Sequence, residues 1–172
     1  MTQQEKHLDT VRAVDEFVKS ASDFDHVQMA GANLWSGWYA KVGTSVALIV
    51  DGARVVYAHA DYRYPEDSAS LVVFTETVVI THSTANVRAK TAPTVQVIPR
   101  SSLTGFTISS SEGLTKGDTG SLTWPGRVEL SLTYPALGSP LQIGANGWGA
   151  EAGAVSSPVL DLVHGLTVDL AA

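Results

Sequence analysis

Apolar residues near the N-terminus repeat with the period of an α-helix. Leu8, Val11, Val14 and Val18 fall near one helical face, and charged side chains cover much of the rest. The run contains no glycine or proline. We therefore predict a helix over residues 3–21.

The C-terminal segment has a second helical pattern. Ser157 can cap the helix and Pro158 suits its first position. Gly165 counts against this prediction, because glycine costs about 1 kcal/mol in a helix interior. The apolar stripe consists of Val159, Leu162, Val163, Leu166 and Leu170.

Between these segments the pattern is that of antiparallel strands. β-Branched residues dominate after residue 30, and they suit the pleated surface of a sheet. The dipeptide Asp51-Gly52 is typical of a two-residue hairpin turn. It predicts a hairpin of Val46 to Val50 with Arg54 to Ala60.

Further strands are predicted at Leu71 to Phe74, Val78 to Thr81, Thr94 to Ile98, Leu103 to Ile108, Arg127 to Tyr134 and Leu141 to Ile143. Residues 109–126 and 144–153 are rich in glycine and small residues, which is typical of loops and linkers.

Two motifs and the closing helix carry a family resemblance. The segment Leu71–His82 is similar to the "threonine turn" hairpin of the bacterial pleckstrin-homology (PH)-like domains. Val95–Pro99 followed by Leu103–Ile108 is similar to their next strand and crossing, and Pro158–Leu170 to their closing helix. The resemblance implies an α+β fold, mostly antiparallel β. In it, a PH-like, partly open barrel of six or seven strands is capped by a C-terminal helix, and the N-terminal helix is extra. We expect residues 1–30 to form that helix and a connector, and residues 31–172 to form the PH-like domain.

Composition narrows the class of protein. The length of 172 residues fits one domain, and 11 basic against 17 acidic residues give a net charge of −6. This balance argues against nonspecific nucleic-acid binding, which needs a positive surface. The absence of cysteine excludes disulfides, thiolate nucleophiles and cysteine zinc sites. The N-terminus lacks the pattern of a secretory signal, and no apolar run approaches the roughly 20 residues that span a bilayer. We expect a cytoplasmic protein.

The resemblance implies a binding or scaffolding role. PH domains that bind phosphoinositides resemble one another in a basic cluster around the first hairpin loop. Here the predicted loop is Asp51-Gly52-Ala53, and only Arg54 lies close by. Because a polyanionic head group needs several cationic donors, we do not expect phosphoinositide binding.

An aromatic segment is the first candidate binding site. Trp35, Trp38 and Tyr39 could form a stacking platform for a sugar or for a proline of a partner. Alternatively, their rings fasten the N-terminal helix to the sheet, because aromatic side chains bury large areas.

Two clusters contain potential metal ligands. Asp23, Asp25 and His26 resemble the start of a calcium loop, but the rest of that loop is missing, so a polar loop after the helix is the alternative. His59 and Asp61 share a strand face, and His82 could join them for metal binding or acid–base chemistry. The alternative is that these histidines are scattered over the surface. We predict no metal and no cofactor.

The nearest approach to a basic patch is Arg88, Lys90 and Arg100. These cations could meet an acidic partner or a phosphate, or could simply be solvated in a loop. Neither a Gly-x-Ser-x-Gly elbow nor a P-loop motif occurs.

We therefore expect a non-catalytic PH-like module that binds a protein or peptide, or acts as a scaffold. Its candidate binding residues are Trp35, Trp38, Tyr39, Arg88 and Arg100. Its candidate surfaces are the aromatic segment near Trp35 and the groove between the closing helix and the edge strand Val95–Ile108. One alternative is a structural subunit of a homo-oligomer or larger assembly. The other is a β-barrel that binds a small ligand or acts as an enzyme.

Overall fold

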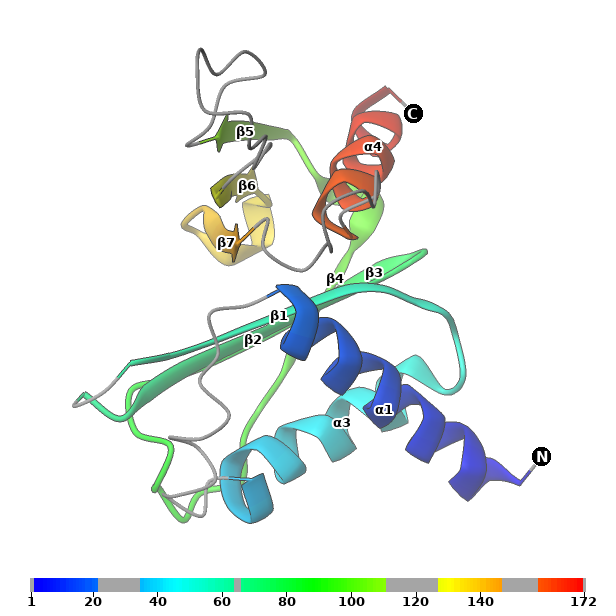
Figure 1. Cartoon of the computed structure of the whole chain (residues 1–172), viewed down its shortest axis with the longest axis vertical. Coiled ribbons are helices and arrows are strands. Elements are labelled where there is room, and N and C mark those ends of the chain that lie inside the picture. The colour runs from blue at the N-terminus through cyan, green and yellow to red at the C-terminus, as the bar shows by residue number, and fades with distance from the viewer. Residues whose placement is uncertain (1, 22–34, 64–65, 111–126, 147–157, 172) are drawn as a thin grey trace, which may run out of the picture.

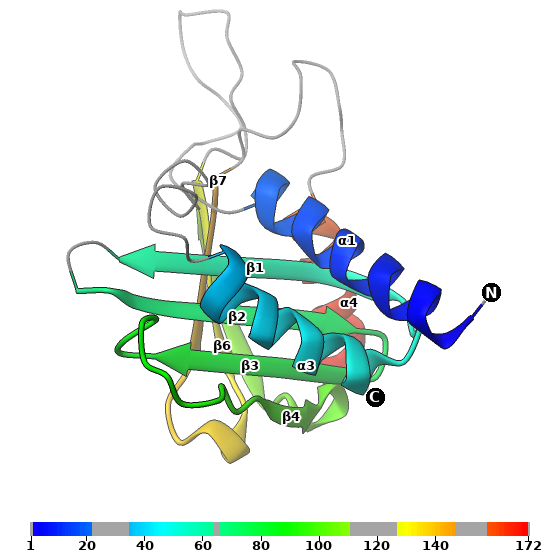
Figure 2. The same cartoon turned by 90° about the horizontal axis from the view of Figure 1, so that it is seen from below.

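The protein is built in three layers, and the computed structural model describes residues 2–21, 35–63, 66–110, 127–146 and 158–171. Two helices, α1 (Gln3–Ala21) and α3 (Ala40–Val50), cover one face of a four-stranded sheet. A three-stranded sheet and the helix α4 (Pro158–Ala171) lie on its other face (Figures 1 and 2). The structure thus has the expected α+β class and the expected helices at both ends of the chain.

The larger sheet is an antiparallel meander in the order β1-β2-β3-β4. Its strands are β1 (Val55–Arg63), β2 (Ser68–Thr75), β3 (Val78–Thr84) and β4 (Gln96–Pro99). The register places His59, Val72, Thr81 and Gln96 in one row across the sheet. Because side chains alternate along a strand, these four residues point to the same face.

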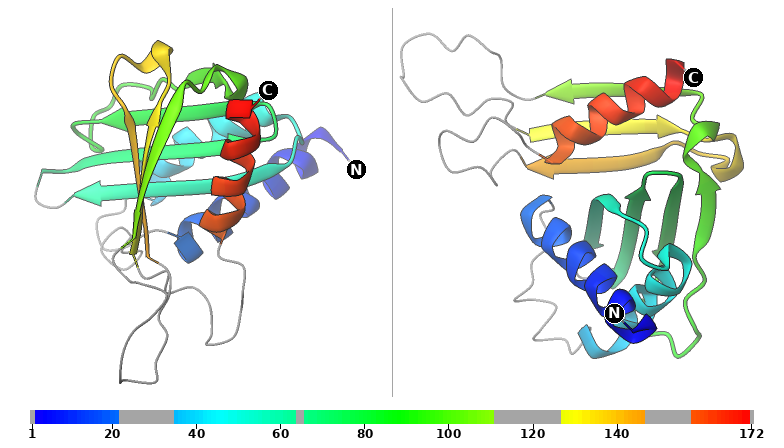
Figure 3. Two further views of the ribbon diagram at one scale, coloured as in Figure 1. Left: turned by 90° about the horizontal axis from the view of Figure 1, so that it is seen from above. Right: turned by 90° about the vertical axis from the view of Figure 1, so that its right-hand side faces the viewer.

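The smaller sheet is also an antiparallel meander, in the order β5-β6-β7. Its strands are β5 (Gly105–Ser110), β6 (Arg127–Thr133) and β7 (Leu141–Asn146). They run across the strands of the larger sheet, and α4 lies along one face of the smaller sheet (Figure 3). The two short 3₁₀ turns η2 (Arg100–Ser102) and η3 (Pro135–Leu137) connect β4 to β5 and β6 to β7.

The predicted first hairpin is wrong. Val46 to Val50 lies in α3 rather than in a strand, and Val42, Val46, Ala47 and Val50 are the buried stripe of that helix. Asp51 has φ of 45° and ends α3 with a hydrogen bond from its backbone N–H to the Ala47 carbonyl. A left-handed residue is common at a helix C-terminus and is required in a type I′ turn, so the sequence Asp51-Gly52 fits either.

The strands do not close into one barrel. They form two separate antiparallel sheets, of four and three strands, accompanied by the C-terminal helix. The connection through η2 lets the chain change direction between β4 and β5, so β5 begins a new sheet instead of continuing the first.

Each face of the larger sheet has its own core. On the helical side, Val14 and Val18 of α1 pack with α3 and with the inward residues of β1 to β3. On the other side, Tyr57 and Phe74 pack with β6, β7 and α4. The alternation of side chains along β1 and β2 divides these residues between the two cores.

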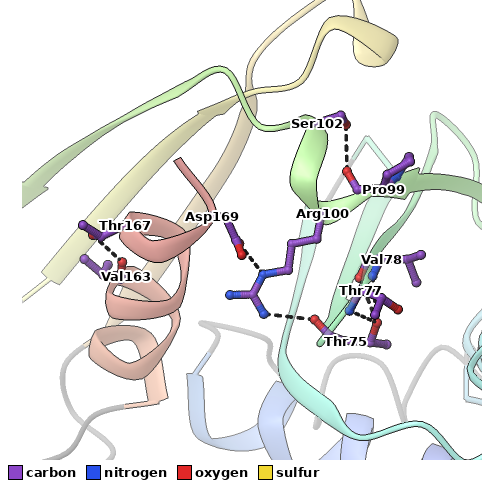
Figure 4. A network of polar contacts seen from close by, with 9 residues as sticks. All are labelled: Thr75, Thr77, Val78, Pro99, Arg100, Ser102, Val163, Thr167 and Asp169. Carbon is purple, nitrogen blue, oxygen red and sulfur yellow. Dashed lines mark hydrogen bonds and ion pairs between the residues drawn. The ribbon is translucent and has the colours of Figure 1, made fainter. Parts of the chain in front are cut away.

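Arg100, on the η2 turn between the two sheets, links the larger sheet to α4 (Figure 4). Its Nε atom donates to Asp169 of α4 at 2.5 Å, and its Nη1 atom donates to the Thr75 carbonyl at 3.1 Å. The Thr75 hydroxyl also accepts the backbone N–H groups of Thr77 and Val78, which orders the β2–β3 turn. Arg100 is only 6% exposed, so its charge needs these partners.

Gly165 provides the space that Arg100 occupies. A Cβ atom at Gly165 would collide with the Arg100 guanidinium. Glycine in the middle of α4 is unfavourable for a helix, but at Gly165 it makes room for the Arg100 side chain. Gly43, the corresponding interior glycine of α3, has ordinary van der Waals room, since the nearest Val11 atom would lie 3.9 Å from its Cβ.

We predict that Gly165→Ala destabilises the protein, although alanine is about 1 kcal/mol better than glycine in helices. The added methyl group would displace Arg100 from Asp169. The matched control Gly43→Ala should stabilise the fold by up to about 1 kcal/mol. Urea denaturation measures both. A Gly165→Ala protein more stable than wild type would contradict the proposed packing.

Candidate functional site

The aromatic segment lies on η1 (Trp35–Tyr39), a single π-helical turn that leads into α3. Trp38 and Tyr39 are each 5% exposed and belong to the core between the helices and the larger sheet. The Trp35 side chain lies outside the described part of the structure. The rings of Trp38 and Tyr39 are thus packed in this core and do not form an exposed stacking platform.

Trp38 begins a short chain of buried hydrogen bonds. Its indole Nε1–H donates to His82 Nε2 at 2.9 Å, and His82 Nδ1 lies 2.6 Å from the Thr94 carbonyl. Because an indole N–H can only donate, His82 Nε2 must accept, and the proton of the neutral ring is on Nδ1. The chain ties η1, β3 and the segment before β4 together.

Tyr39 is held in its neutral form. Burial, and secondarily the negative charge of Asp15, raise the pKa of the Tyr39 hydroxyl well above its usual value. A buried neutral phenol of this kind contributes to packing at all physiological pH values.

The two candidate arginines differ in burial and in their ion-pair partners. Arg100 is buried against α4 and paired with Asp169. Arg88 is exposed, and its Nε lies 2.8 Å from Asp67. The groove expected between the closing helix and the edge strand is therefore the place where the Arg100 side chain sits, and the predicted basic patch is divided between two regions.

His59, Asp61 and His82 all border one hollow, but the His82 side chain does not share a sheet face with the other two. His82 points to the helical side of the larger sheet, where it meets Trp38. His59 and Asp61 belong to the opposite face, since Tyr57 on the same face of β1 packs toward the smaller sheet. No cluster of three metal-ligating side chains occurs among the described residues. The other predicted cluster, Asp23, Asp25 and His26, lies outside the described residues.

A hollow of about 600 Å³ lies between the two sheets, and we call it the inter-sheet cleft. Its floor is the polar end of the larger sheet, and β7 with its preceding turn forms a wall. The floor residues are His59, Asp61, Arg63, Ser70, Val72, Thr81, Ser83 and Gln96, and the wall includes Glu129, Ser139, Leu141, Gln142 and Gly144.

The cleft has a mixed polar chemistry. Hydroxyl and amide groups alternate with the Asp61–Arg63 ion pair, whose atoms lie 3.1 Å apart. Such a lining presents both donors and acceptors and has no dominant charge. It is suited to a ligand with many uncharged hydrogen-bonding groups, such as an extended peptide.

A second hollow of about 410 Å³ lies on the other side of the β3 end, and we call it the loop cleft. It is bounded by η1, the start of α3 and the segment from residue 82 to residue 94. Trp38 and Arg88, two of the candidate residues from the sequence, both line it. Lys41 and Lys90 line it as well.

Comparisons with protein-family models, with curated proteins and with solved structures found no match. None of the helices among the described residues combines the length and the apolar character needed to cross a membrane.

Most lining residues of the inter-sheet cleft were not predicted as site residues. One signal was present, because the apolar position Tyr57 on β1 is followed on the same face by His59, Asp61 and Arg63. This change from apolar to polar marks where the core ends and an open cleft begins. The contribution of β7 had no comparable signal, because it depends on how the two sheets cross.

We predict that Trp38→Phe lowers the free energy of unfolding by at least about 1–3 kcal/mol, because it leaves His82 Nε2 buried without a donor. Tyr57→Phe is the control. The Tyr57 hydroxyl is buried and has no hydrogen-bond partner among the described residues, so its removal should cost nothing. Thermal denaturation of both variants measures the difference, and equal stabilities would refute the role given to the Trp38–His82 bond.

Proposed function

We propose that the chain is a non-catalytic binding module of PH-like architecture, which holds a segment of a protein or peptide partner in the inter-sheet cleft. The observation that carries the proposal is the cleft itself, a preformed polar hollow of about 600 Å³ that is built mainly from strands. Its volume lies within the usual range of ligand sites.

The element order supports the PH-like part of the proposal. A four-stranded meander, a crossing three-stranded meander and a C-terminal helix follow one another along the chain. The motif Leu71–His82 forms the β2–β3 hairpin, and its Thr75 hydroxyl organises the turn. The helix α4 lies along one face of the smaller sheet, while the cleft borders β7 and the polar end of the larger sheet.

The chemistry of the lining supports a peptide ligand rather than a polyanionic lipid head group. The floor contains carboxylate, guanidinium, imidazole, hydroxyl and amide groups from all four strands of the larger sheet. The first hairpin of the structure joins β1 to β2, and its loop contains Glu66 and Asp67 after Arg63, with Arg88 already paired to Asp67. A phosphoinositide head group would require more cations in such a loop.

We predict that peptides selected from a random library on the full chain lose at least roughly tenfold in affinity for Thr81→Arg. Thr81 lies on the floor of the cleft, and the longer arginine side chain would occupy the space of the ligand. Thr44→Arg is the matched control, because Thr44 is exposed on α3 in the helical layer.

Isothermal titration calorimetry gives the dissociation constants. Peptides that bind wild type and Thr44→Arg equally and Thr81→Arg weakly would support the proposal. Peptides that bind all three proteins equally would overturn it, as would failure of the selection to yield a binder.

A further inference from the structure

The loop cleft differs from the inter-sheet cleft in its charge. Three cations, Lys41, Arg88 and Lys90, line it, and no aspartate or glutamate among the described residues does. The chain as a whole has 11 basic and 17 acidic residues. The charged side chains of the described lining are all cations, so their sign is opposite to that of the chain as a whole, and they concentrate positive potential in a concave place.

The two lysines are available to a ligand. Both are exposed, and within the described residues neither has an ion pair. Arg88 is held through Nε by Asp67, which in turn accepts a hydrogen bond from the Tyr62 hydroxyl at 2.7 Å. Asp67 thus fixes the orientation of the Arg88 guanidinium and compensates its charge. The positive charges of the two lysine ammonium groups are uncompensated.

The wall of the cleft is fixed in place. The hydrogen bonds from Trp38 to His82 and between His82 and the Thr94 carbonyl join η1, the end of β3 and the far end of the loop. At the near end, the Asn86 side chain accepts the Arg88 backbone N–H, and the Val87 backbone N–H donates to the Asp67 carbonyl. The cations are therefore presented by a segment that is anchored on both sides, which lowers the ordering cost of binding.

We propose that the loop cleft is a second binding site, for an acidic peptide segment. Each lysine ammonium group acts as a flexible point charge, so the two lysines can pair with separate carboxylates along a peptide. The volume of about 410 Å³ is in the range of ligand sites and accommodates more than a single small ion. The lysines line the loop cleft and not the inter-sheet cleft, so this proposal stands or fails separately from the proposed function.

Hexaglutamate peptide tests this site by calorimetry at low salt. Wild type should bind it, and the affinity should fall as salt screens the charges. The double variant Lys41→Glu/Lys90→Glu should bind roughly tenfold more weakly or not at all. The control Arg12→Glu/Arg54→Glu changes the net charge equally, but its two arginines do not line the cleft. All four positions are exposed, so both variants should fold, which circular dichroism verifies.

Retained affinity in the control, together with loss in the cleft variant, would support the site. Equal weakening of both variants would show that binding follows net charge alone and would overturn it. Absence of hexaglutamate binding by wild type would also overturn the proposed site.

Inorganic phosphate is titrated in a separate experiment. A protein that binds phosphate but not hexaglutamate would have a small-ion site, which also contradicts the proposal. The variant Thr81→Arg should bind hexaglutamate like wild type.

Discussion

A buried guanidinium connects the parts of this protein. Arg100 follows β4 at the point where the chain leaves the larger sheet, and its charge is compensated by Asp169 near the C-terminal end of α4. An unpaired charge in this position would cost several kcal/mol, so α4 must bring Asp169 to Arg100 whenever the protein is folded. Gly165 permits the approach because it leaves the guanidinium room against the helix.

The position of α4 determines which face of the smaller sheet is covered by a helix. The helix packs Val159, Leu162 and Leu166 against β6 and β7 and completes the second core. The polar end of the larger sheet lies outside this core and lines the inter-sheet cleft with β7. The position of α4 therefore accounts for both the second core and the inter-sheet cleft. The cleft is built from strands although the sheets do not close into a barrel.

Local patterns predicted the elements whose environment is simple. The helix of residues 3–21 has one buried face, and β6 alternates strictly between apolar and polar side chains, so their periods could be read directly. The α3 helix was mistaken for a strand because Val46 to Val50 is a continuous apolar run, and the left-handed Asp51 fits both interpretations. Here the tertiary context of a buried helix outweighed β propensity.

Properties that depend on distant residues could not be predicted. Arg100 and Asp169 are 69 residues apart, so the sequence showed Arg100 as a loop cation available to partners. His82 was one possible neighbour of His59 in the sequence, and the register puts their side chains on opposite faces of one sheet. The two clefts lie where segments distant in sequence meet, and only the fold defines them.

Amide hydrogen exchange of Arg100→Gln tests most directly whether Arg100 fixes α4. Loss of a buried ionic partner of this kind costs about 3 kcal/mol or more, which corresponds to roughly a hundredfold faster exchange. We expect this acceleration in the α4 amides that are protected in wild type, with α1 and β1 to β3 remaining close to wild type. Unchanged protection of α4 in the variant would contradict the account.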